Sequence, residues 1–148
     1  MTTSRHIAIV GAGMAAITCA RTLVQAGHRV TVFEKSHGMG GRMSARNSPF
    51  GTFDHGAQYF TVRDARFELA LQTTPGLCRP WSANTVRVLD AHGRVAAAGL
   101  PAREAHWVPK PGMNALVRAW AKPLADAGRV ELQTKVTAIE ADPLNKSQ

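Results

Sequence analysis

The chain has 148 residues, of which 45% are hydrophobic and 19% charged, and its 18 Lys and Arg against 10 Asp and Glu give a formal net charge of +8. This composition excludes a disordered or collagen-like chain, and the two cysteines exclude a disulfide scaffold. We expect no nucleic-acid binding, because the basic residues form no run. We also expect no membrane span, because apolar stretches such as Ile7–Val10 are far shorter than the roughly 18 residues required. The apolar stretch ends at Gly11 with no cleavage site after it, so we expect a cytoplasmic protein with reduced thiols.

The first 34 residues predict a strand, a helix and a second strand. Residues 5–10 are typical of a buried strand, and the glycines that follow end it. A helix then runs to Gly27, where small and apolar side chains share one face: Ala15, Ala16, Cys19, Ala20, Leu23 and Val24. Residues 29–33 form the second strand. Because right-handed crossovers make such strands parallel neighbours, we predict a Rossmann-like α/β fold with a parallel sheet.

The middle of the chain predicts a loop, a helix and a strand-rich segment. Residues 36–49 have the glycine, serine and proline content of a loop. A helix over residues 64–73 places Phe67, Ala70 and Leu71 on one face. A β-hairpin follows, with strands at residues 86–89 and Val95 around a turn at residues 90–93.

The last part of the chain predicts a helix over residues 113–121, with Leu116, Val117 and Trp120 on its apolar face. Two short strands follow, at residues 130–132 and 136–139. We therefore expect a dinucleotide-binding domain from residues 1–74 and 110–148, and the beginning of a strand-rich substrate domain in residues 75–109.

The segment Gly11-Ala12-Gly13-Met14-Ala15-Ala16 follows the first predicted strand and opens the first predicted helix. This is the context of the dinucleotide-binding fingerprint G-x-G-x-x-G/A. Gly11 permits the tight turn, Gly13 lets a pyrophosphate approach the backbone, and Ala16 keeps the helix close to the sheet. The unpaired N–H groups of the helix N-terminus then attract the phosphates.

Glu34, at the end of the second predicted strand, supplies the acid expected roughly 20 residues after the first glycine. Its carboxylate can accept hydrogen bonds from ribose hydroxyls and repels a 2′-phosphate. This favours NAD or FAD over NADP, although Lys35 beside it weakens the repulsion. The alternative is an incidental glycine-rich turn in an unrelated α/β domain.

A second glycine-rich loop, Gly40-Gly41-Arg42-Met43-Ser44, carries a guanidinium suited to the other side of an extended pyrophosphate, which favours FAD over NAD. With this loop the chain resembles the flavin-containing amine oxidase superfamily, and within it the renalase-like branch. Two further segments carry the resemblance, residues 54–61 (DHGAQYFT) and 107–116 (WVPKPGMNAL).

The resemblance implies a set of FAD contacts. Residues 11–15 would surround the phosphates and Glu34 would hold the adenosine ribose. Gly41 and Arg42 would lie over the pyrophosphate and ribityl region, and Val136 would touch the adenine end through its backbone. The isoalloxazine would be approached by Gly56, Ala57, Gln58 and Tyr59.

The resemblance also implies a flavin-dependent oxidoreductase, in which hydride passes from a reduced nicotinamide isomer or an amine to FAD and dioxygen reoxidises the flavin to give hydrogen peroxide. It implies that this chain is the front part of a longer protein, so we expect little or no turnover from it alone. We assign no catalytic residue, because a lone histidine such as His55 is more often solvent-facing, and no metal site, because no Cys/His cluster has ligand spacing. A non-catalytic dinucleotide-binding fragment and an NAD-dependent dehydrogenase domain stay open, as does the oligomeric state.

Overall fold

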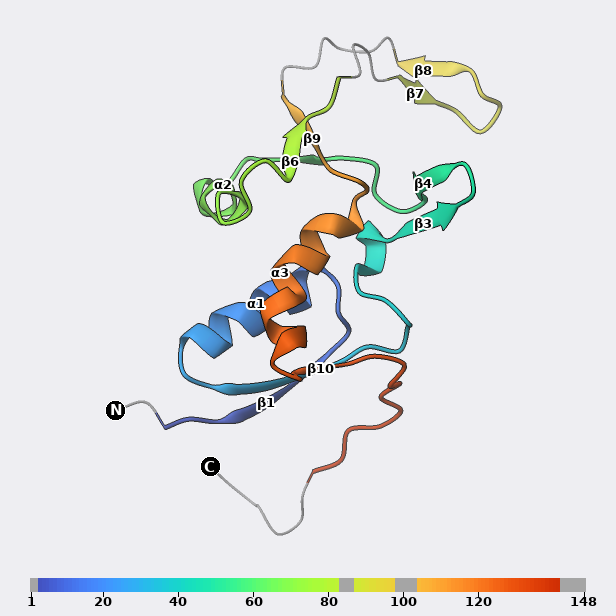
Figure 1. Cartoon of the computed structure of the whole chain (residues 1–148). Helices are drawn as coiled ribbons and strands as arrows, with labels where there is room; N and C mark the ends of the chain where they lie inside the picture. The colour runs from blue at the N-terminus through green and yellow to red at the C-terminus, as the bar shows by residue number, and fades with distance from the viewer. Residues whose placement is uncertain (1–2, 83–86, 98–103, 142–148) are drawn as a thin grey trace. The chain divides into compact units, whose positions relative to one another are not determined.

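The computed structural model describes residues 3–82, 87–97 and 104–141 (Figure 1). Its contacts divide the chain into a first unit, residues 1–41 and 120–148, and a second unit, residues 42–119. The sequence-based division, with residues 75–109 as the beginning of a substrate domain, stays a prediction.

The first unit contains a parallel sheet with the strand order β1-β2-β10. Its strands are β1 (His6–Val10), β2 (Arg29–Phe33) and β10 (Val130–Glu131). The register pairs His6 with Arg29 and Val10 with Phe33, so the carboxyl ends of β1 and β2 lie side by side. The predicted strands at residues 5–10, 29–33 and 130–132 are confirmed, and the fold is Rossmann-like α/β.

Helix α1 (Met14–Gln25) connects β1 to β2 and packs against β2 (Figure 1). It ends just before Gly27, whose positive φ of 86° turns the chain towards β2. The predicted apolar face was wrong in part, because Ala15 and Cys19 are exposed. Ile17 and Ala20 are the fully buried positions. The prediction had followed the small residues and omitted Ile17, whose larger apolar side chain gains more from burial.

Helix α3 (Asn114–Asp126) begins in the second unit and ends in the first. The prediction ended this helix at residue 121, but it continues through Pro123. Its buried side chains continue the helical spacing to the last turn: Leu116, Val117, Trp120, Ala121 and Leu124. Burial of Leu124 therefore outweighs the cost of the exposed Pro123, which removes one backbone hydrogen bond.

In its described residues the second unit has three small antiparallel sheets and, besides the first part of α3, one further helix. The sheets are the hairpin of β3 (Ala45–Ser48) and β4 (Gly51–Asp54), the set β5-β9-β6 (Phe60–Thr61, His106–Pro109 and Cys78–Pro80), and the hairpin of β7 (Val88–Leu89) and β8 (Val95–Ala97). This further helix is α2 (Ala65–Leu71). A short 3-10 turn, η1 (Gly41–Met43), includes the last residue of the first unit's opening segment and the first two residues of the second unit.

Two of the predicted elements in this unit are confirmed. Asp64 caps α2, since its side chain accepts a hydrogen bond from the Arg66 N–H at 2.8 Å. The hairpin at β7 and β8 turns on Asp90, whose carboxylate accepts hydrogen bonds from two backbone N–H groups of the turn. Residue 86, included in the predicted strand, lies outside the described residues.

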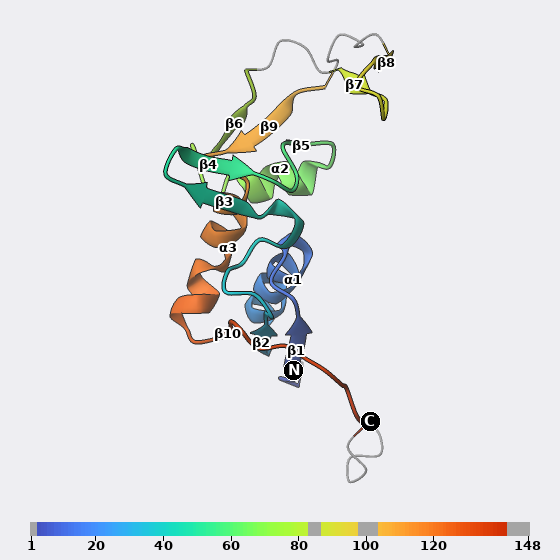
Figure 2. The same cartoon turned by 90° about the vertical axis from the view of Figure 1, so that its right-hand side faces the viewer.

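Two predictions were wrong. Residues 36–49 are not all loop, because β3 occupies residues 45–48 and pairs with β4 (Figure 2). Residues 136–139 form no strand, although they were expected to be the second of the two short strands after the last helix. A strand needs a partner for its backbone groups, and within the described chain none pairs with this segment, where Ile139 is 86% exposed.

Within residues 3–82, 87–97 and 104–141, no helix is long and apolar enough to cross a membrane. No group of three or more His, Cys, Asp and Glu side chains in those ranges is placed to hold a metal ion.

Candidate dinucleotide-binding site

The turn from β1 into α1 depends on Gly11. Its φ is 94°, a value that side-chain-bearing residues rarely adopt, and its N–H donates to the Phe33 carbonyl at 2.7 Å. The turn therefore stays tied to the end of β2. Gly13 follows as the N-cap of α1, and no side chain from the described part of the chain caps the helix there.

The first turn of α1 contains Met14, Ala15 and Ala16 and no acidic residue. The first N–H groups of an α-helix have no acceptor within the helix, so this end carries a partial positive charge. The site residues predicted between positions 11 and 16 thus form one continuous turn with donors for an anion.

Glu34 is buried, with 7% of its surface exposed, and both carboxylate oxygens accept backbone hydrogen bonds. Oε2 accepts from the Ala12 N–H at 2.7 Å, and Oε1 accepts from the Ser36 N–H at 2.8 Å. Burial acts to raise the pKa of Glu34, but the hydrogen bonds from Ser36 and Ala12 outweigh it and hold the pKa below its usual value. Glu34 is therefore an anion at neutral pH that joins the end of β2 to the glycine turn.

The second glycine loop lies directly against the first. The Gly40 N–H donates to the Ala12 carbonyl at 3.0 Å, and Gly13 and Gly40 form an isolated parallel bridge. A Cβ at Gly41 would lie 3.2 Å from the Gly13 Cα. Glycine at position 41 therefore allows the two backbones to touch, a contact that the sequence did not predict, since Gly13 was assigned to the approach of a pyrophosphate alone.

A hollow of about 370 Å³ opens at the carboxyl ends of β1 and β2. It is lined by Val10, Gly11, Phe33, Glu34, Lys35, Thr134, Lys135 and Val136. Four of the predicted site residues, from three distant segments, therefore meet around one space. In Rossmann-like sheets ligands bind at this edge.

Backbone hydrogen bonds hold the third segment of this hollow in place. The Thr134 N–H donates to the Glu34 carbonyl at 2.9 Å, and the Gln133 N–H donates to the Ser36 carbonyl at 3.0 Å. Val136 is half-buried as a result. Thr134 and Lys135 were missed from the sequence, since no local motif marks residues that become neighbours of β2 only through the fold.

The remaining predicted residues lie in the second unit. The Ala57 N–H donates to the Arg42 carbonyl at 2.8 Å, and a Cβ at Gly56 would collide with that same carbonyl oxygen. Arg42, Gly56 and Ala57 are thus brought together through their backbones. Gln58 is exposed, and the Tyr59 ring stacks on His106 with 4.0 Å between the ring centroids.

His55 is exposed, and its Nε2 lies 3.2 Å from the Ser44 hydroxyl oxygen. Among the described residues it has no charged partner that would mark a general base. We assign it no catalytic role.

Residues 9–70 match the family model of NAD(P)-binding Rossmann-like domains. Two relatives share short stretches of sequence: a 4,4′-diapophytoene desaturase of Staphylococcus haemolyticus, 45% identical over 39% of this chain, and an L-amino-acid oxidase of Siganus canaliculatus, 48% identical over 34% of this chain. The aligned stretches cover 12% and 10% of the lengths of these two proteins.

The solved structure of 2,6-dihydroxypyridine-3-hydroxylase from Arthrobacter nicotinovorans superposes with a TM-score of 0.56 at 19% identity. The superposition covers 95% of this chain and 31% of that one, and at this identity it shows the fold alone. The two chains therefore share a fold, and residues 9–70 resemble NAD(P)-binding Rossmann-like domains in sequence.

Proposed function

We propose that this chain forms the FAD-binding part of a flavin-dependent oxidoreductase of the renalase-like type. The observation that carries the proposal is the hollow at the ends of β1 and β2, which gathers Gly11, Glu34 and Val136. Glycine fingerprints alone are weak evidence, but here the turn, the acid and a segment from a distant part of the chain surround the same space.

The residues at this site fit the ADP portion of a dinucleotide. The Gly11 and Ala12 N–H groups are already bonded within the protein, so the first turn of α1 after them offers the N–H donors for the phosphates. The nearby ammonium groups of Lys35 and Lys135 add positive charge. Oε2 of Glu34 accepts the Ala12 N–H, and a carboxylate oxygen has a second acceptor position that a ribose hydroxyl could use. The Val136 backbone would meet the adenine.

FAD is favoured over NAD by the second glycine loop and by the segment that follows it. A simple nicotinamide-binding domain has no need of Gly41 and Arg42, or of the segment Gly56–Tyr59. In the proposal Gly41 and Arg42 hold the pyrophosphate and ribityl region, and residues 56–59 approach the isoalloxazine. The chemistry that FAD would supply is two-electron oxidation of a reduced nicotinamide isomer or an amine, with dioxygen as the final acceptor and hydrogen peroxide as the product.

The test is a titration of the purified chain with FAD, NAD and ADP, followed by flavin absorption and fluorescence or by calorimetry. We expect saturable FAD binding and weaker binding of the other two. Glu34→Gln should weaken FAD binding roughly tenfold, because a hydrogen bond to a charged acceptor is worth about 1.5–3 kcal/mol. Glu131→Gln, which removes an exposed carboxylate from β10, is the matched control and should leave the affinity unchanged.

Equal affinity for NAD and FAD would favour the NAD-dependent dehydrogenase instead, and no binding of any dinucleotide would overturn the proposal. If FAD binds, peroxide formation with reduced nicotinamide isomers and with amines separates an oxidase from a non-catalytic dinucleotide-binding fragment.

A further inference from the structure

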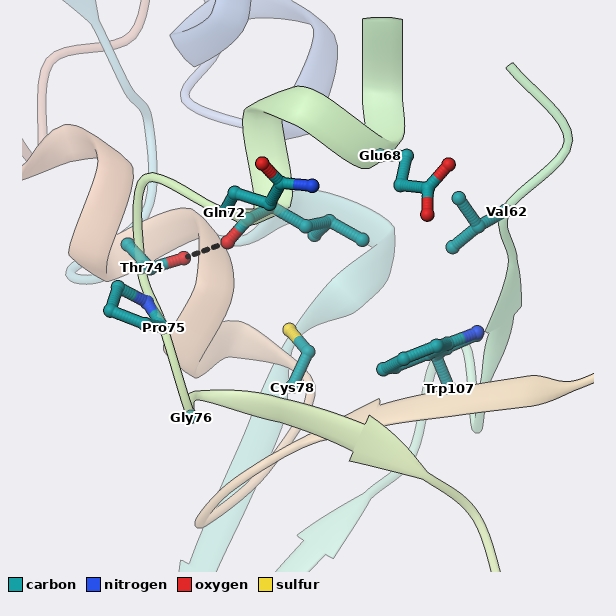
Figure 3. A pocket seen from close by; sticks show the side chains of 9 residues that line it. Val62, Glu68, Gln72, Thr74, Pro75, Gly76, Cys78 and Trp107 are labelled. Atoms are coloured by element: carbon teal, nitrogen blue, oxygen red, sulfur yellow. Dashed lines mark hydrogen bonds between the residues drawn. The ribbon is translucent and has the colours of Figure 1, made fainter. Parts of the chain in front are cut away.

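The second unit contains a cavity of about 440 Å³ that none of the predicted FAD-binding residues lines (Figure 3). It lies between α2, the segment after it, and the strands β6 and β9. Its lining residues are Val62, Glu68, Leu71, Gln72, Thr74, Pro75, Gly76, Cys78 and Trp107. The volume is within the usual range for small-molecule sites.

Glu68 is the only carboxylate in this lining, and it has no hydrogen bond or ion pair in the described part of the unit. The other carboxylates of the unit all accept hydrogen bonds: Asp54 from the Met113 N–H, Asp64 from Arg66, Asp90 from the turn of its hairpin, and Glu104 from Arg63. Figure 3 shows the Glu68 carboxylate turned towards the space above Trp107. The cavity thus contains one negative charge that the protein does not neutralise locally.

The rest of the lining is apolar or uncharged. Val62 and Pro75 form aliphatic walls, and the Trp107 indole supplies an aromatic one (Figure 3). Leu71 also belongs to the apolar lining. Cys78 adds a soft thiol, and burial raises its pKa to about 11, so it stays neutral at physiological pH and adds no second negative charge. With no basic side chain in the lining, an anionic ligand would meet only repulsion there.

We propose that this cavity binds a small organic ammonium ion. A carboxylate and an indole attract such a cation, and the aliphatic walls favour its alkyl groups. A bare metal ion would find a single carboxylate where it needs several oxygen ligands, and a neutral molecule would gain no electrostatic attraction from Glu68. The proposal does not depend on FAD binding, since it involves none of the residues assigned to the cofactor.

The test uses the full chain labelled with 5-fluorotryptophan, in which each of the three indoles gives a separate ¹⁹F resonance. Trp107→Phe identifies the Trp107 resonance. Choline is the probe, and 3,3-dimethylbutan-1-ol, which has nearly the same shape and no charge, is the control ligand. We expect choline to shift the Trp107 resonance saturably and the neutral alcohol to bind roughly tenfold more weakly.

Glu68→Gln should weaken choline binding roughly tenfold, whereas Glu140→Gln, at an exposed carboxylate of the first unit, should not change it. Glu68 is itself exposed, so its substitution should not unfold the chain. Equal binding of choline and the alcohol, an unchanged affinity in Glu68→Gln, or a choline shift confined to the other two indoles would each refute the proposal.

Discussion

Glu34 makes stability depend on pH. Its pKa in the folded chain lies below its ordinary value of 4.5, so its ionised form stabilises the fold. That contribution is complete above about pH 4.5, where the carboxyl would ionise even in the unfolded chain, and it is lost as the pH falls through the lower folded pKa. We expect the difference in free energy of unfolding between the wild type and Glu34→Gln to be largest near neutral pH and to shrink in acid. Urea titrations at several pH values measure it; a difference that is constant with pH would show that the Glu34 charge contributes nothing.

Position 56 requires glycine because it lies directly against the backbone of Arg42. A Cβ at this position would collide with the Arg42 carbonyl oxygen, which cannot move aside as a flexible side chain can. Gly56→Ala should therefore lower the free energy of unfolding by about 1–3 kcal/mol. Gly38→Ala is the matched control, because a Cβ at Gly38 meets nothing within 4 Å and should be neutral or slightly stabilising. Thermal melting of the two variants side by side tests this prediction. Equal melting midpoints would contradict the steric requirement for glycine at position 56.

At the scale of single elements, Pro123 weakens the last turns of α3. It lies inside the helix, where it cannot donate a backbone hydrogen bond, and its own ring is exposed, so it contributes little packing. Pro123→Ala should raise the free energy of unfolding by roughly 1–2 kcal/mol, because alanine restores the backbone N–H donor and removes the clash of the proline ring with the preceding turn. Urea denaturation measures the gain, with Lys122→Ala as the exposed neighbouring control. A loss of stability would mean that the proline ring stabilises the end of the helix.

Elements with a strong local signal could be predicted from the sequence. The order strand, glycine turn, helix, strand at residues 5–33 was predicted because its periodicity and its glycine signals agree. The β3–β4 hairpin was missed because residues 45–48, Ala-Arg-Asn-Ser, have no apolar alternation, and side-chain bonds such as Ser48 Oγ to the Gly51 carbonyl shape its turn. Residues 136–139 show the reverse case, since β-branched side chains without a partner strand do not form a strand.

In the candidate site too, residues with a local sequence signal could be predicted, and residues brought in only by the fold could not. Gly11 and Glu34 could be identified because each stands at a fixed place relative to its own strand. Thr134 and Lys135 could not, because they reach the hollow only through hydrogen bonds to the end of β2. The contact of Gly13 with Gly41 was hidden for the same reason, although both glycines were predicted to bind the cofactor.

At the scale of the whole molecule, the residues proposed to bind FAD fall into two groups. Those assigned to the ADP portion belong to the first unit, and residues 56–59, assigned to the isoalloxazine, belong to the second. Arg42, assigned with Gly41 to the pyrophosphate and ribityl region, also belongs to the second unit. A ligand that contains only the ADP portion can therefore report on the first group alone. This difference offers a test of the FAD assignment that does not need a substrate.

We expect ADP to slow amide hydrogen exchange in the glycine turn and the 133–136 segment, and FAD to slow it there and also at residues 56–59. Binding to the folded state alone stabilises by about 2.7 kcal/mol at a ligand concentration one hundred times Kd, so both ligands should be compared at equal saturation. The β7–β8 hairpin, which contains no predicted contact, serves as the internal control. If FAD protected no more amides than ADP does, the chain would bind the ADP portion without contacting the flavin. The glycine loop at residues 40–44 would then be explained by its backbone contact with Gly13 and not by a cofactor.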